Sequence, residues 1–172
     1  MRGCVDMSQS GAEHFETTIY DPSYASGFTI CEDEAGNTLV RVTRPWQGTT
    51  LEEQTLAIFA TEEASKGYTG QHIVGHADRV VCMSTSHIAM LDAIECVDAV
   101  VGVSGKQYIT NEAVANNPAV KDIGYDSNLN YEALVLLQPD VVLMYGVSAA
   151  NDTVTAKLRD LNIPYLYLGD YT

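Results

Sequence analysis

The serine, histidine and cysteine side chains are the residues of this sequence that could carry nucleophilic or metal chemistry. His72 and His76 are four residues apart, a spacing that places two zinc ligands on one face of a helix. The residues between them are Ile-Val-Gly, and Gly70 lies just before them, so a helix is not expected here. The pair alone does not predict a metal site, although His14 and His87 leave open a wider set of histidine and carboxylate ligands.

Ser86 and His87 are neighbours and could form a nucleophile and its base. A catalytic triad also requires an orienting acid and a strained turn such as Gly-x-Ser-x-Gly, and the sequence around Ser86 lacks that turn. Serine is a preferred residue at the start of a helix. We therefore expect Ser84 or Ser86 to cap a helix and His87 to lie in its first turn, which leaves Ser86 without a catalytic role.

The four cysteines form no Cys-x-x-Cys pair, which argues against a zinc ribbon and a thioredoxin-type motif. Cys82 lies in an apolar strand and Cys96 in a predicted helix, where free cysteine commonly behaves as a small hydrophobic residue. Cys4 follows Gly3 and precedes a small, polar stretch, as the lipid-bearing cysteine of bacterial lipoproteins does. We expect residues 1–15 to form a tether, which either carries lipid on Cys4 or is a disordered tail in which Cys4 has no role.

The composition is that of an acidic globular domain. The chain has 172 residues, of which 46% are hydrophobic, enough for one well-buried core rather than two. Its formal net charge of −14 argues against nucleic acid and against adsorption to anionic lipid, because both need clustered Lys and Arg. No apolar run approaches the ~20 residues of a membrane-spanning helix.

The first half of the chain has the alternating pattern and the turn residues of β-structure. Two β-forming segments flank Glu-Ala-Gly-Asn at residues 34–37, so a β-hairpin is predicted from Phe28 to Val42. Residues 55–59 are a further short strand. We expect residues 16–78 to form a β-rich extension.

From Arg79 onward, short apolar strands alternate with helices. The strands are predicted at residues 80–83, 100–103, 141–144 and 165–168. Asn130 is a suitable N-cap for the helix at residues 131–138. Such alternation gives a mainly parallel sheet with helices on both faces. We therefore predict an α/β fold in which a three-layer, Rossmann-like core over residues 79–172 follows the N-terminal β-hairpin extension.

In a parallel sheet, ligands bind at the edge formed by the carboxyl ends of the strands. The loops expected at that edge are rich in hydroxyl groups, glycines and tyrosines. The candidate ligand-binding residues among them are Thr85, Ser86, Lys106, Tyr108, Tyr145 and Gly146. These loops contain no Gly-x-Gly-x-x-Gly or Walker pattern for phosphates. Their composition favours a large, partly aromatic ligand over a nucleotide.

Several strings after residue 79 resemble the periplasmic substrate-binding proteins that serve ABC importers of siderophores, haem and vitamin B12. The strings are Arg-Val-Val-Cys-Met-Ser-Thr-Ser-His-Ile at 79–88, Val-Gly-Val-Ser-Gly at 101–105, Asn-Tyr-Glu-Ala-Leu at 130–134, Gln-Pro-Asp-Val-Val at 138–142 with Tyr-Gly at 145–146, and Leu-Arg-Asp-Leu-Asn-Ile-Pro at 158–164. Each is short, but together they follow the order and spacing of that family. The segment ending in Arg-Pro-Trp-Gln-Gly at 44–48 is similar to the N-terminal extension of a bacterial iron-transport subgroup.

The resemblance implies two α/β lobes joined by one long helix, with the ligand between them. This sequence would then be the amino-terminal lobe, with the carboxy-terminal lobe absent, so that it carries half of a ligand site. By similarity to the B12-binding member, Tyr108, Tyr125 and Tyr145 are the aromatic residues of the cleft. Glu132 takes the place of a glutamate that pairs with arginines of the membrane permease.

The function that this resemblance implies is binding without catalysis. The protein would capture an iron complex (siderophore or haem) or cobalamin in the periplasm or at the cell surface and deliver it to the permease and its ATPase, with no intrinsic cofactor. Two alternatives stay open: a small α/β hydrolase or reductase component that uses the same sheet edge, and a metal-ion-binding protein. An enzyme should bring titratable groups together at the strand ends, where this sequence offers Lys106 and Asp170 among hydroxyls and aromatics.

Overall fold

The computed structural model describes residues 11–21, 23, 27–43, 45, 53–125, 128–145 and 150–168, without the side chains of Ala150 and Asn151. The chain divides into two compact units near residue 77. The β-rich unit comprises residues 1–45, 50–76 and 172, and the α/β unit comprises residues 46–49 and 77–171. Each unit buries hydrophobic residues of its own, so the expectation of a single core is wrong. In the described part of the chain, no helix has both the length and the apolar character needed to span a membrane.

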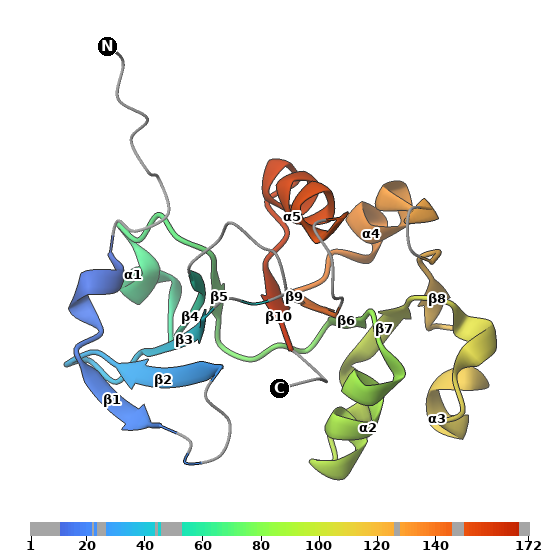
Figure 1. Ribbon diagram of the computed structural model, residues 1–172, viewed down its shortest axis with the longest axis horizontal. Coiled ribbons are helices and arrows are strands. Elements are labelled where there is room, and N and C mark those ends of the chain that lie inside the picture. Colours follow the sequence, from blue (N-terminus) through green and yellow to red (C-terminus); the bar gives the residue numbers. More distant parts are fainter. Residues whose placement is uncertain are drawn as a thin grey trace. The chain divides into compact units, whose positions relative to one another are not determined.

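The β-rich unit contains a five-stranded sheet in which the strands follow their order along the chain (Figure 1). The strands are β1 (Thr17–Tyr20), β2 (Phe28–Glu32), β3 (Thr38–Thr43), β4 (Glu53–Phe59) and β5 (His72–Val74). The pairs from β1 to β4 are antiparallel, and β4 pairs with β5 in parallel. The predicted hairpin is confirmed by β2 and β3, in which Phe28 is paired with Val42.

The core of the β-rich unit forms around three aromatic rings. The ring centroids of Phe15 and Phe59 are 6.1 Å apart, and those of Phe59 and Tyr68 are 5.2 Å apart, both in edge-to-face arrangements. Ala12 belongs to the same buried cluster and lies in the short 3-10 helix η1 (Ala12–His14). The predicted tether is therefore wrong for residues 12–15, because this segment closes the core. Cys4 lies outside the described residues.

The α/β unit contains a parallel sheet in the order β10-β9-β6-β7-β8. Its strands are β6 (Val80–Cys82), β7 (Val100–Val103), β8 (Lys121–Asp122), β9 (Val141–Met144) and β10 (Tyr165–Tyr167). Its helices are α2 (Thr85–Ala93), α3 (Glu112–Ala115), α4 (Tyr131–Leu137) and α5 (Ala150–Asp160), and the short α1 (Glu62–Ser65) belongs to the β-rich unit. Figure 1 shows α4 and α5 on one side of the sheet and α2 and α3 on the other. The predicted three-layer α/β fold with a β-hairpin extension is confirmed.

Helix α4 packs closely against β7, and a glycine in the strand allows this close approach. Gly102 is buried in the middle of β7, and a Cβ there would lie 2.8 Å from Cδ1 of Leu137, so any larger residue would require the Leu137 side chain to shift. Arg79 binds the same end of the helix, since its Nε and Nη2 donate to the main-chain oxygen of Leu137 at 2.9 and 2.6 Å. The helix ends there because Gln138 adopts a left-handed conformation, with φ of 46°, before Pro139.

The cysteines differ sharply in exposure. Cys82 is buried in β6, and burial raises the pKa of its thiol to about 12. Cys31 is also buried, whereas Cys96 is exposed and lies beyond the end of α2. The expectation that both Cys82 and Cys96 are small hydrophobic residues therefore holds for Cys82 and is wrong for Cys96.

This difference predicts selective alkylation. At pH 8, the exposed Cys96 should react readily with iodoacetamide, whereas burial and the raised pKa of its thiol should protect Cys82. A timed pulse followed by peptide mass spectrometry measures both rates. Because the folded-state pKa of Cys82 is raised, its protection should persist below pH 9 and weaken only as the pH rises toward 12. Equal labelling of both cysteines in folded protein would contradict the buried position of β6.

Candidate functional site

Two tyrosines meet at the carboxyl edge of the parallel sheet. Tyr108 lies in the 3-10 helix η3 (Lys106–Tyr108) after β7, and Tyr125 lies in the loop after β8. Parallel pairing of β7 with β8 brings the two loops together, and the ring centroids are 5.8 Å apart at an interplanar angle of 57°. Their exposed fractions are 63% and 45%, so both rings offer faces to solvent. The pair is an exposed aromatic surface where α/β folds bind ligands.

One carboxylate organises both loops. Asp122, the last residue of β8, accepts hydrogen bonds from the main-chain N–H groups of Gly105 at 3.2 Å, Lys106 at 3.0 Å and Gly124 at 2.9 Å. A carboxylate that accepts several N–H bonds stabilises a turn more strongly than a neutral acceptor. Asp122 was not predicted from the sequence as a site residue. Its position two residues before Gly124 was the available signal.

Gly105 lies directly beneath the tyrosine pair. Its φ is +68°, and a Cβ there would lie 2.9 Å from Cδ2 of Tyr108 and 3.2 Å from Cδ2 of Tyr125. A side chain at this position would therefore separate the rings as well as strain the backbone. Asp122 and Gly105 together position the pair.

The side chain of the candidate residue Lys106 forms hydrogen bonds to main-chain carbonyl groups of the same unit. Its Nζ donates to the carbonyl oxygens of Asn117 at 2.5 Å and Val120 at 2.7 Å, and so ties η3 to the segment that leads into β8. This arrangement gives Lys106 a structural role at the site in addition to its predicted contact with ligand.

The residues after β6 are arranged as the start of a helix. Ser84, rather than Ser86, is the N-cap of α2: its Oγ accepts a hydrogen bond from the N–H of Ser86 at 3.3 Å. Of the two serines that the sequence offered as caps, Ser84 is therefore the one that caps the helix. The hydroxyls of Ser84 and Ser86 are 2.8 Å apart, and Thr85 between them is exposed. His87 lies in the first turn, as predicted, but is fully buried, with its Nε2 3.4 Å from the carbonyl oxygen of Leu168.

The remaining histidines do not gather into a metal centre. His72 lies in strand β5, which agrees with the prediction that this segment is not helical, and His76 is exposed beyond that strand. In the part of the chain that the structure describes, no group of three or more His, Cys, Asp or Glu side chains is placed to hold a metal ion.

Three further candidates belong to the segment after β9 and to helix α4. Tyr145 directly follows β9 and is half-buried, while Gly146 lies outside the described residues. Glu132 is exposed in the first turn of α4, whose N-cap is Asn130, as predicted; the Oδ1 of Asn130 accepts a hydrogen bond from the N–H of Ala133 at 2.9 Å. A carboxylate in the first turn is also favoured by the helix dipole.

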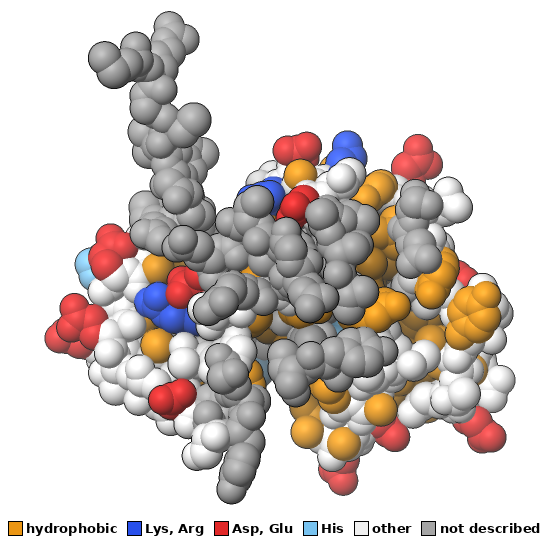
Figure 2. Space-filling model, viewed as in Figure 1, with side chains coloured by type: hydrophobic (Ala, Val, Ile, Leu, Met, Phe, Trp, Pro, Cys, Tyr) orange, Lys and Arg blue, Asp and Glu red, His pale blue; other side chains and the backbone are white. Residues whose placement is uncertain are grey.

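Hydrophobic side chains gather on the surface around these elements. Figure 2 shows them over α4 and near β8. Among the exposed large hydrophobic residues of these elements and their loops, Leu136 is 82% exposed and Val135 is 47% exposed, and Tyr108 and Tyr125 are the others. The α/β unit thus exposes large apolar side chains on α4 as well as at the tyrosine pair.

Comparison with known proteins finds similarity to periplasmic binding proteins in the second half of the chain. Residues 80–163 match the family model described as periplasmic binding protein. The chain is 29% identical over 103 residues to an uncharacterized lipoprotein of Methanocaldococcus jannaschii, with 54% of this chain and 24% of that protein covered. It is similar to the crystal structure of the periplasmic vitamin B12 binding protein of Vibrio cholerae, with 20% identity, a TM-score of 0.43, and 53% and 34% of the two chains covered. It is also similar to the molybdate periplasmic binding protein of Haemophilus influenzae, with 23% identity and a TM-score of 0.47. That match covers 56% of this chain and 31% of the Haemophilus chain.

The resemblance to periplasmic binding proteins that the sequence predicted is confirmed by the match of this family model over residues 80–163, just under half of the chain. The proteins of this family are binding proteins of transport systems rather than enzymes. The chain spans about a quarter of the length of the curated relative it matches and about a third of each of the two structures.

Proposed function

We propose that the protein containing this chain is the substrate-binding component of an ABC importer for an iron complex (siderophore or haem) or cobalamin. It delivers this ligand to the permease and its ATPase. The observation that carries the proposal is the exposed pair of Tyr108 and Tyr125 at the carboxyl edge of the parallel sheet, in a segment that matches the periplasmic binding protein family. Tyrosine faces of this kind stack on flat, conjugated ligands and on the aromatic groups of siderophores.

The other candidate residues lie on segments that follow strands of the same sheet. Thr85 and Ser86 follow β6, Tyr145 follows β9, and Lys106 lies with Tyr108 in η3. A binding site for a ligand of this size buries most of the ligand surface. The second lobe that the family resemblance implies would supply the opposite wall.

The acidic composition disfavours one kind of ligand. A net charge of −14 repels a polyanionic ferric catecholate more than it repels haem, cobalamin or a neutral siderophore complex. A basic second lobe would reverse this preference. The proposed location is the periplasm or the cell surface, with a lipid anchor on Cys4; the name of the Methanocaldococcus relative as a lipoprotein supports the anchor.

Titration of the natural full-length protein tests the ligand site. Haem, a ferric siderophore and cobalamin are added in turn while tyrosine fluorescence is followed. Replacing Tyr125 with alanine should weaken binding of the true ligand by about 1–3 kcal/mol, because a stacked aromatic contact is lost. Tyr20, a 51% exposed tyrosine of the β-rich unit, is the matched control, and Tyr20→Ala should leave the affinity unchanged. Equal losses in both variants, or no binding of any of the three ligands, would argue against the site.

Docking to the permease is tested separately from binding. The variant Glu132→Arg reverses the charge at this position and should impair uptake by cells, while the ligand affinity of the purified protein stays the same. The reason is that an ion pair at the rim of an interface mainly affects how fast and in what orientation the protein docks on the permease. Glu112 is the matched control, since it is also an exposed glutamate in the first turn of a helix, α3. A variant Glu112→Arg that impairs uptake equally, or a Glu132→Arg variant that loses ligand binding, would overturn the assignment.

A further inference from the structure

Strand β1 is the outer strand of the sheet in the β-rich unit. The sheet order begins with β1, and the described residues place no strand on its other side. All four of its residues are exposed, and the exposed fractions of Ile19 and Tyr20 are 50% and 51%. An outer strand presents main-chain N–H and C=O groups that can pair with another chain, and β1 lacks the proline and lysine that commonly prevent such pairing.

The register of β1 restricts the length of any added strand. Thr17 and Thr18 pair with Glu32 and Cys31 of β2, but the register shifts before Tyr20, so that Ile19 has no partner. Such a bulge bends the strand locally. A chain added to β1 would therefore pair over a few residues, and its affinity would have to come partly from contacts beyond the strand.

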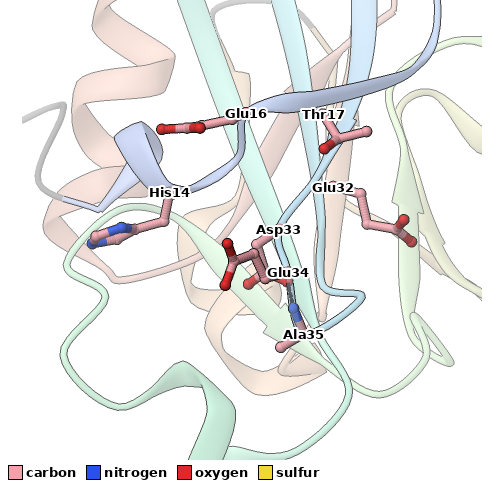
Figure 3. A pocket seen from close by; sticks show the side chains of 7 residues that line it. All are labelled: His14, Glu16, Thr17, Glu32, Asp33, Glu34 and Ala35. Carbon is pink, nitrogen blue, oxygen red and sulfur yellow. Dashed lines mark hydrogen bonds between the residues drawn. The ribbon is translucent and has the colours of Figure 1, made fainter.

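A groove at the start of β1 offers such contacts. It has a volume of about 420 Å³, and seven residues line it (Figure 3), namely His14, Glu16, Thr17, Glu32, Asp33, Glu34 and Ala35. Because Thr17 pairs with Glu32, the groove lies at the end of the β1–β2 ladder and continues the line of the outer strand. In Figure 3 the carboxylate of Glu16 lies on the same side as His14, whereas that of Glu32 points to the other side.

The carboxylates of the groove are not equally available to a partner. Asp33 accepts hydrogen bonds from the N–H groups of Ala35 at 2.9 Å and Asn37 at 2.8 Å and from Nδ2 of Asn37 at 2.7 Å, so its oxygens hold the hairpin turn. Burial alone would raise the pKa of Asp33, but these hydrogen bonds outweigh it and lower the pKa below the ordinary value. Asp33 therefore stays charged at neutral pH, while the exposed Glu16 and Glu34 are open to a cation.

The charge of this region selects the kind of partner. A second copy of the chain would bring the same carboxylates together, in a molecule whose net charge is already −14, and like charges across paired strands are destabilising. A basic segment meets no such repulsion and is attracted over a distance. We propose that β1 and the acidic groove bind an extended segment of another protein, in which β-forming residues are flanked by Lys or Arg. The segment pairs with β1 as an added strand and places its cation against Glu16 and Glu34.

Three capped peptides test this interaction against the full chain. The first is Lys-Thr-Val-Thr-Val-Thr-Lys, the second has glutamate at both ends, and the third keeps the lysines but has proline in place of both valines. At about 20 mM salt, where surface charges are weakly screened, the first should bind at least about tenfold more tightly than either of the others in fluorescence anisotropy. It should also slow the amide hydrogen exchange of residues 17–20. Because Glu16 and Glu34 are exposed, the double variant Glu16→Lys with Glu34→Lys should fold normally and prefer the glutamate peptide.

The same measurements can overturn the proposal. Equal binding of the proline peptide would show attraction by charge without strand pairing, and equal binding of the glutamate peptide would remove the role of the groove. Protection of amides outside residues 17–20 would place the peptide elsewhere. Protection of those amides without peptide, increasing with protein concentration, would identify a second copy of the chain as the occupant.

Discussion

Replacing Gly124 with alanine should lower the free energy of unfolding of the α/β unit by about 3 kcal/mol. Gly124 has a φ of +85°, and a Cβ there would lie 2.2 Å from the main-chain oxygen of Asn128. No rotation of a side chain relieves a clash with backbone. The turn must therefore open, although it is closed by hydrogen bonds from Asn128 N to the oxygen of Tyr125 at 3.1 Å and from Asn130 N to the oxygen of Ile123 at 2.8 Å.

The same change should also disturb the proposed ligand site, because Tyr125 directly follows Gly124 and the Gly124 N–H is held by Asp122. Urea denaturation followed by amide hydrogen exchange measures the loss of stability in each unit. Gly67→Ala is the matched control: φ at Gly67 is +88°, but nothing lies within 4 Å of its added Cβ. Gly67→Ala should lower the free energy of unfolding by about 1 kcal/mol, because alanine is less stable than glycine in the left-handed conformation. Similar losses at both glycines would show that the contact with Asn128 contributes nothing.

Replacing Leu134 with alanine should destabilise the α/β unit by about 2–5 kcal/mol. The Leu134 side chain is 1% exposed on the face of α4 that packs against β7. Its removal leaves a cavity that the tight approach of α4 over Gly102 cannot close, because the Leu137 side chain already occupies the space above that glycine.

Leu136 is the control on the same helix. It is two residues away and 82% exposed, so Leu136→Ala should change the free energy of unfolding by less than about 0.5 kcal/mol. Chemical denaturation of both variants measures the difference directly. A loss at Leu136 comparable with that at Leu134 would mean that α4 buries the opposite face.

Local patterns were sufficient to predict the main elements. Alternating residues on either side of Glu-Ala-Gly-Asn predicted the β2–β3 hairpin, and apolar runs separated by capping residues predicted β6, β7, β9 and β10. The cap of α4 at Asn130 was predicted correctly because capping depends on residues three apart in sequence. The cap of α2 could be narrowed only to Ser84 or Ser86, because the sequence offers two serines and a threonine in succession, and the structure shows that it is Ser84.

Burial was harder to predict than secondary structure. Ala12 and Phe15 were assigned to a tether because no pattern surrounds them, yet they complete the core against Phe59 and Tyr68, more than 40 residues away. Cys96 was expected in a helix, but α2 ends before it, and the chain leaves the helix through Glu95 with a φ of 59°. Contacts between distant parts of the chain decided these positions, and they leave little trace in a local window.

The sequence by itself determined the class of fold, the family resemblance over its second half, and the aromatic character of the loops that follow the strands. The tertiary structure decided which of those loops meet. Parallel pairing of β7 with β8 places Tyr108 and Tyr125 together, and Asp122 holds both loops through three main-chain N–H groups. The physical reason is that strand order in a parallel sheet is set by long-range pairing and helix packing, whereas propensity and capping act over a few residues.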